Sequence, residues 1–127
     1  MANIPNIQGS WKVTTNGWSG TLTISSVDEQ GQLTGQLTIS TNDTGTPTGE
    51  AATSVSGYWD AGAQELWFVR DMRNIHPEQP LPFQVYTAYG YRSGTSNITD
   101  TLAGAFEAFF ATDRHRFGWV SFRQFPG

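Results

Sequence analysis

The side chains that could do chemistry are few in this sequence, and their spacing favours binding over catalysis. The absence of cysteine excludes a thiol nucleophile, a thiolate metal site and a disulfide framework. The two histidines, His76 and His115, lie far apart and match no spacing of metal ligands. The sequence also lacks the Gly-x-Ser-x-Gly motif, a phosphate-binding loop and an acidic pair at an informative spacing. We therefore expect a protein that is not an enzyme and that uses no metal and no cofactor.

The charge balance narrows the range of partners. Of the 127 residues, 14% are charged, the formal net charge is −4, and Lys12 is the only lysine. An acidic chain with one lysine binds nucleic acid or an anionic membrane surface poorly, so we expect neither partner. No apolar run approaches the length of a membrane-spanning helix. The first six residues have neither the basic nor the apolar region of a signal peptide, and the compartment stays open.

The sequence predicts an all-β chain with one domain over residues 1–127. Aromatic residues make up 13% of it, and alternating apolar and polar residues are separated by turn residues such as Asn16-Gly17. A helix over Leu102–Phe110 is the alternative in one place, because Ala and Glu favour helix, whereas Gly104 and the pair Phe109-Phe110 favour a strand. The eight predicted strands are Ile7–Thr15, Trp18–Ser26, Gln32–Ser40, Ala52–Asp60, Gln64–Met72, Phe83–Arg92, Thr99–Thr112 and His115–Phe125.

The lengths of the connections predict the architecture. Short connections make consecutive strands antiparallel neighbours, and eight such strands close into an up-and-down barrel, with a sandwich as the alternative. Two longer segments without periodicity, Thr41–Glu50 and Arg73–Pro82, follow the third and the fifth strand. In an up-and-down meander these connections lie at the same end, so we expect them to border one mouth of the barrel.

Four short motifs resemble the avidin/streptavidin family of the calycins. They are Gly9-Ser10-Trp11, which resembles the Gly-x-Trp signature of calycins, and Leu33-Thr34-Gly35, Val55–Asp60 and Phe117–Phe122, which resemble the third, fourth and last strands of avidins. The resemblance covers nearly the whole chain and implies an eight-stranded meander barrel that associates through its later strands. It also implies that an arginine near the end of the chain, Arg123 or Arg116, covers Trp11.

The residues with which avidins bind biotin are not matched in this sequence. The resemblance places Val13, Leu37 and Val120 where avidins have an Asn, a Tyr and an Asp that contact the ureido group. Without these side chains the buried polar atoms of biotin would have no partners. We therefore expect an avidin-like barrel that does not bind biotin.

The barrel interior is the predicted binding site for a small apolar or aromatic ligand. Alternation from Trp11 places Val13 inside, and an avidin-like register places Trp67 and Val69 there. On the sixth and eighth predicted strands either face could point inward, and we take the face with Tyr86 and the face with Val120 as candidates. The candidate ligand-binding side chains are Val13, Trp67, Val69, Tyr86, Phe106, Phe110 and Val120. In the alternative interpretation, these side chains simply fill a small barrel.

Two other kinds of binding protein remain open. A carbohydrate-binding module would stack sugars on Trp18, Trp59, Tyr58 and Tyr91, which lie near predicted turns. A protease inhibitor or another protein-interaction barrel would instead insert the segment Arg73–Pro82, which three prolines constrain.

The last two predicted strands carry apolar residues on both faces. A strand that faces water is expected to be polar on one side, so a second apolar face indicates a partner. We expect self-association into a dimer or tetramer through Phe109, Trp119 and their neighbours.

Overall fold

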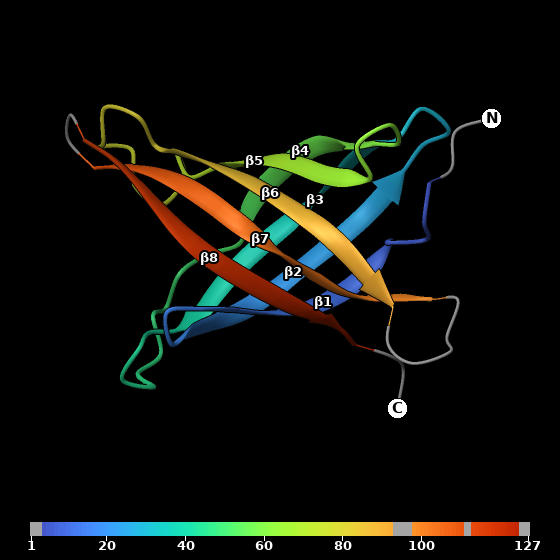
Figure 1. Cartoon of the computed structure of the whole chain (residues 1–127). Helices are drawn as coiled ribbons and strands as arrows, with labels where there is room; N and C mark the ends of the chain where they lie inside the picture. The colour runs from blue at the N-terminus through green and yellow to red at the C-terminus, as the bar shows by residue number, and fades with distance from the viewer. Residues whose placement is uncertain (1–3, 93–97, 111–112, 125–127) are drawn as a thin grey trace.

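Eight antiparallel strands close into one barrel in the computed structural model, which describes residues 4–92, 98–110 and 113–124 (Figure 1). Each strand pairs with the next along the chain, and β8 pairs with β1, so the meander closes without a crossover. The predicted up-and-down barrel is therefore confirmed, and the sandwich is not the fold. The strands are β1 (Gly9–Thr15), β2 (Trp18–Val27), β3 (Gln32–Thr41), β4 (Thr53–Asp60), β5 (Glu65–Asp71), β6 (Phe83–Arg92), β7 (Thr99–Phe110) and β8 (Asp113–Arg123).

The strand boundaries follow local sequence signals closely. Asn16 and Gly17 adopt φ values of 49° and 82°, as a two-residue type I′ hairpin turn requires. The helix considered for Leu102–Phe110 is wrong, because this segment pairs with both β6 and β8. Backbone pairing on two sides outweighs the helix propensity of its alanines. The predicted strand ends at Thr112 and Phe125 lie outside the described residues.

The meander sends its connections alternately to two ends of the barrel. The loop end carries turn 16–17, loop 42–52 and loop 72–82, and it lies on the left in Figure 1. The Trp11 end carries turns 28–31 and 61–64 and lies on the right. The two long connections thus share one end, as the meander predicts. At that end an ideal Cβ on Gly17 would lie 3.2 Å from the Cβ of Asp43, so the first turn and loop 42–52 are close together.

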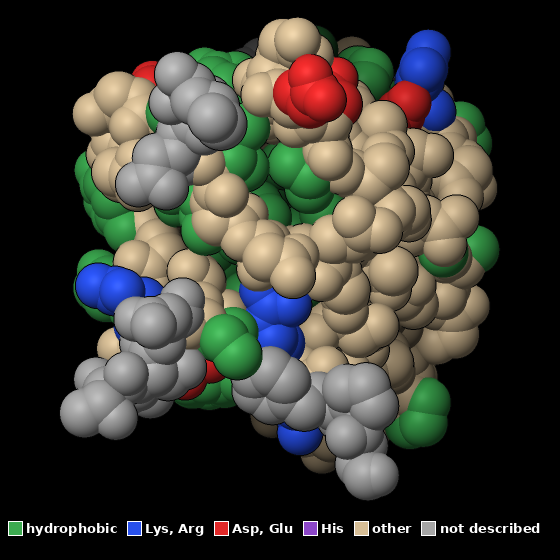
Figure 2. Space-filling view, turned by 90° about the vertical axis from the view of Figure 1, so that its right-hand side faces the viewer, with side chains coloured by type: hydrophobic (Ala, Val, Ile, Leu, Met, Phe, Trp, Pro, Cys, Tyr) green, Lys and Arg blue, Asp and Glu red, His purple; other side chains and the backbone are tan. Residues whose placement is uncertain are grey.

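The Trp11 end of the barrel is held by a buried tryptophan and an arginine. The indole Nε1 of Trp11 donates to the carbonyl oxygen of Ile7 at 2.9 Å, and the guanidinium of Arg123 lies 4.5 Å above the Trp11 ring. Arg123 also donates to the carbonyl oxygens of Thr99 at 2.9 Å, of Gln8 at 3.1 Å and of Asn6. Figure 2 looks onto this end and shows basic side-chain atoms near its centre.

Of the two arginines that the resemblance offered for Trp11, the structure selects Arg123. Arg116 is exposed and lies 3.9 Å from Glu107 on the neighbouring strand. Partial burial lowers the pKa of Arg123.

The apolar core continues from this end into the barrel and consists chiefly of Ile7, Trp11, Val13, Leu22, Ile24, Leu33, Leu37, Val55, Trp59, Leu66 and Leu102.

Candidate ligand-binding site

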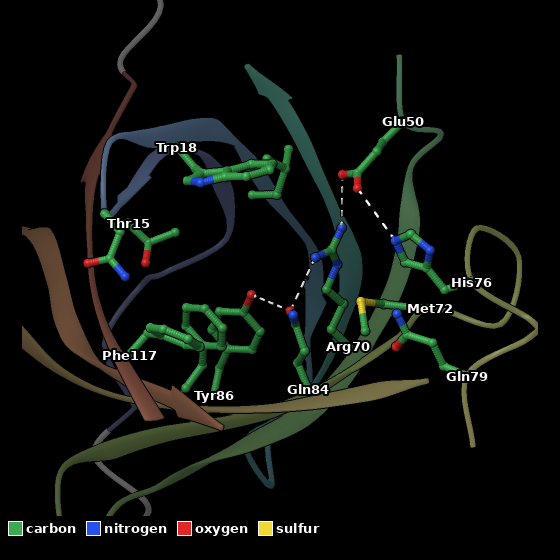
Figure 3. A pocket seen from close by; sticks show the side chains of 13 residues that line it. Thr15, Trp18, Glu50, Arg70, Met72, His76, Gln79, Gln84, Tyr86 and Phe117 are labelled. Carbon is green, nitrogen blue, oxygen red and sulfur yellow. Dashed lines mark hydrogen bonds and ion pairs between the residues drawn. The ribbon is translucent and has the colours of Figure 1, made fainter. Parts of the chain in front are cut away.

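A cavity of about 280 Å³ opens at the loop end of the barrel (Figure 3). Its walls come from the inner faces of the strands, and its rim comes from the turn and the two loops of that end. Trp18 lies at the rim with 39% of its surface exposed, and Ile39 lines the wall. His76 and Gln79 extend the rim from loop 72–82.

Stacked aromatic rings form the floor of this cavity. The ring of Tyr86 lies between Phe68, with centroids 4.6 Å apart, and Phe106, with centroids 4.7 Å apart. The ring of Phe117 lies beside Phe106, with centroids 5.3 Å apart and the ring planes tilted by 36°. Trp119 meets Phe68 and Tyr86 edge-on at 5.9 Å and 5.5 Å. Such stacked and edge-on pairs fix the rings in place, so the cavity has a rigid apolar base.

One wall of the cavity is polar and is organised by Arg70. This side chain points inward from β5 and is 4% exposed. Its Nε donates to Thr53 Oγ1 at 2.7 Å, and its Nη1 donates to Gln84 Oε1 at 3.1 Å. The Tyr86 hydroxyl donates to the same Gln84 oxygen at 2.8 Å. Burial raises the pKa of Tyr86 to about 12, so its hydroxyl remains a donor at neutral pH.

Loop 42–52 brings Glu50 over the guanidinium from the rim. Glu50 Oε2 lies 3.6 Å from Arg70 Nη2, and neither of these buried atoms makes a hydrogen bond. The other carboxylate oxygen, Oε1, lies 3.8 Å from Nε2 of His76. Nδ1 of His76 lies 3.5 Å from Glu78 Oε1. A row of charged and ionisable side chains, Arg70, Glu50, His76 and Glu78, therefore runs from the buried wall to the surface.

Hydrogen bonds to backbone carbonyls close loop 72–82 and join it to loop 42–52. The amide of Met72 donates to the carbonyl of Pro82 at 2.8 Å and closes loop 72–82 at its base. The amide of His76 donates to the carbonyl of Met72 at 2.8 Å. Asn74 Nδ2 donates to the carbonyl of Ala52 at 2.9 Å, which joins the two loops. The segment proposed for insertion into a protease is thus closed at its base and joined to loop 42–52.

Three of the predicted binding residues have inward, buried side chains. Tyr86 and Phe106 line the cavity, and Val13 is buried in the core. The side chain of Phe110, at the end of β7, lies outside the described part of the structure.

Three other predicted residues have the wrong orientation. Trp67 and Val69 lie on the outer face, and Val69 is 39% exposed. The cause is the register of β5, in which Leu66, Phe68 and Arg70 take the inner positions, and a shift of one residue moves every side chain to the other face. Val120 likewise faces outward because its neighbours in β8, Trp119 and Ser121, are the buried ones.

Two tryptophans that were predicted to lie on the surface are buried instead. Trp119 is 4% exposed, and its Nε1 donates to the carbonyls of Thr87 and Ala105 at 3.1 Å and 3.2 Å, so it cannot form a self-association surface. Trp59 is buried in the core and is not part of a sugar-stacking platform. Tyr58 lies on the outer face, stacked parallel to Trp67.

The polar wall was not predicted, although one signal for it exists in the sequence. Leu66, Phe68 and Arg70 alternate along β5, so an inward Leu66 places a cation inside the barrel. Gln84 then faces Arg70 directly in the β5–β6 register. Glu50 carries no comparable signal, because its position depends on the course of an irregular loop.

Comparisons with known proteins add no family assignment. No protein-family model matches the chain, and no curated protein matches it significantly. The closed eight-stranded meander is compatible with the avidin-like fold that the sequence motifs resemble. Among the described residues, no group of three or more His, Cys, Asp or Glu side chains could hold a metal ion. The same residues include no helix that is long and apolar enough to cross a membrane.

Proposed function

We propose that this protein is a non-catalytic binding barrel that takes a small aromatic ligand into the cavity at its loop end. The observation that carries the proposal is the aromatic floor of Tyr86, Phe106 and Phe117 beneath an open cavity of about 280 Å³. Binding sites for small molecules are typically concave and apolar, with a few polar groups that fix orientation. The Arg70 wall supplies such groups on one side.

The size and lining of the cavity favour a planar ligand of one or two rings. The cavity is close to the lower limit of typical small-molecule sites, about 300 Å³. Both faces of the Tyr86 ring are covered by Phe68 and Phe106, so a planar ligand ring would lie against Phe117. It would gain about 1 kcal/mol per aromatic contact beyond the burial of its apolar surface. Trp18 at the rim would cover the exposed edge of such a ring and would report its binding by fluorescence.

We also propose that the barrel is an avidin-like calycin that has exchanged biotin for another ligand. The contact between Trp11 and Arg123 supports this kinship. Of the three positions where avidins contact the ureido group, Val13 and Leu37 are buried apolar side chains and Val120 faces outward. We expect no measurable affinity for biotin.

Isothermal titration calorimetry with two bicyclic probes, 2-naphthoate and its neutral amide 2-naphthamide, tests the proposed function. We expect at least one probe to bind with one site per chain. Ile39→Trp, which places an indole in the cavity, is expected to reduce that binding at least about tenfold. Gln36→Trp is the matched control, because it adds the same indole on the exposed face of the same strand. Binding of neither probe, or binding unaffected by Ile39→Trp, would refute the proposal.

A further inference from the structure

Arg70 is a buried cation inside a small barrel, and such a side chain is costly unless it is fully paired. Two of its nitrogens are paired with neutral oxygens, those of Thr53 and Gln84. These bonds orient the guanidinium but bring no negative charge. The third nitrogen, Nη2, has a carboxylate near it but donates no hydrogen bond, and Arg70 lines the cavity.

The carboxylate beside Nη2 is a poor fit for its position. A charge-assisted hydrogen bond between a guanidinium and a carboxylate usually measures about 2.8 Å, whereas Glu50 Oε2 stands 3.6 Å from Nη2. Oε2 is itself buried and without a hydrogen bond. Glu50 therefore supplies the countercharge of Arg70 without the hydrogen bond that would normally accompany it.

Glu50 is also attached in a way that allows it to leave. It follows Gly49, which has a φ of 69° and no atom within 4 Å of an ideal Cβ, so the backbone there is in open surroundings. The amide of Glu50 has a 3.2 Å bond to Thr48 Oγ1, within its own loop. Its Oε1 already lies 3.8 Å from His76 at the rim, which offers the carboxylate a second cationic partner when His76 is protonated (Figure 3).

We propose that Glu50 is an internal competitor for a carboxylate of the ligand, and that the ligand is accordingly a small aromatic acid whose carboxylate pairs with Arg70. This inference rests on the proposed function and specifies its ligand class. The ring lies over the Tyr86–Phe106–Phe117 floor, and the carboxylate takes the place of Glu50 at Nη2. Glu50 then turns toward His76.

The competing explanation is structural: the ion pair simply fastens loop 42–52 to the wall. Removal of the Glu50 charge has a different effect on binding under each explanation. A fastening role predicts weaker or unchanged binding of any ligand, because the loop loses an anchor. A competitor role predicts tighter binding of an aromatic acid and unchanged binding of its neutral amide.

Calorimetric titration of the full chain with 2-naphthoate and 2-naphthamide separates these explanations. We expect Glu50→Gln to raise the affinity for 2-naphthoate about tenfold, equivalent to one charge-assisted hydrogen bond regained, and to change that for 2-naphthamide less than about twofold. Glu78→Gln is the matched control: it removes the same charge from the other, exposed partner of His76. It should change neither affinity more than about twofold.

The reciprocal substitution removes the cation. Arg70→Met is expected to abolish the preference for 2-naphthoate over 2-naphthamide. Arg73→Met, which removes an exposed arginine paired with Asp71, should leave that preference intact. Circular dichroism and melting curves establish that each variant folds, and Glu50→Asp, whose shorter side chain cannot approach Nη2 as closely, is the second variant if Glu50→Gln does not fold.

Failure of the aromatic-acid inference and failure of the proposed aromatic binding site give different results. Binding of both probes with equal affinity, unchanged in Glu50→Gln, would overturn the acid-specific inference and leave the aromatic binding site standing. Weaker binding of 2-naphthoate to Glu50→Gln would overturn it in favour of the fastening role. Binding of neither probe to the wild-type chain or to any variant would refute the proposed function itself.

Discussion

Replacement of Arg123 by methionine is expected to destabilise the barrel without affecting the loop end. The guanidinium contributes a cation–π contact to Trp11 at 4.5 Å and hydrogen bonds to the carbonyls of Thr99 and Gln8 at 2.9 Å and 3.1 Å. The cation–π contact of a half-buried arginine stabilises by about 1 kcal/mol. Each hydrogen bond from a charged donor adds about 1 kcal/mol after screening by solvent.

These contributions give a loss of about 3 kcal/mol in the free energy of unfolding for Arg123→Met. For a domain of this size, such a loss lowers the melting temperature by about 10 °C. Arg123→Lys should lie between the variant and the wild type, because an ammonium keeps the charge but lacks the planar face and the fork of donors. The core is otherwise untouched, so the denaturant dependence of unfolding should not change.

Urea unfolding followed by far-ultraviolet circular dichroism measures this loss directly. The midpoint should fall for Arg123→Met at an unchanged slope. Affinity for a naphthalene probe should remain within about twofold of wild type in the folded variant. A loss below about 0.5 kcal/mol, or a selective loss of probe affinity at full stability, would refute the assignment of Arg123 to the structural end of the barrel.

Three further outcomes are expected from particular contacts. Burial raises the pKa of Tyr86 to about 12 from the ordinary 10.0, so the unfolded chain loses this proton first. The free energy of unfolding should therefore fall as the pH rises from 10 toward 12. Urea titrations of Tyr86→Phe should lack this part of the fall, which is on the order of 2 kcal/mol. Gly104→Ala would place a Cβ 1.9 Å from the Thr87 carbonyl oxygen and should cost about 1–3 kcal/mol in thermal melts, whereas Gly62→Ala, whose nearest atom is a side-chain oxygen at 3.4 Å, should be near neutral. We still expect a dimer or tetramer by light scattering, now through the outer face that includes the 52% exposed Phe122; Phe122→Glu should lower the mass, and a monomeric wild type would contradict this expectation.

The fold could be predicted from the sequence because its signals are local. Turn residues such as Asn16-Gly17 and the period-two alternation placed the eight strands within a few residues of their observed bounds. Short connections then left few arrangements other than a meander. The position of the long loops at one end followed from the order of the strands alone.

The cavity lining was harder to predict because it depends on which face of each strand points inward. On β5 both alternating sets are apolar: Leu66 and Phe68 on one face, Trp67 and Val69 on the other. Local hydrophobicity therefore cannot decide between them. The choice is made by packing across the barrel, where Phe68 stacks on Tyr86. That choice also brings Arg70 inside, which is why the polar wall was missed.

The five tryptophans allow one measurement of the central claim that a ligand binds at the loop end. Trp18 lines the cavity, Trp119 supports its floor, Trp11 and Trp59 lie in the core, and Trp67 faces outward. In a ¹⁵N–¹H correlation spectrum titrated with 2-naphthoate, we predict saturable shifts of the indole signals of Trp18 and, to a smaller extent, of Trp119. The signals of the other three should remain in place. Saturable shifts at Trp67 with none at Trp18, or no saturable shift at any indole, would contradict the account.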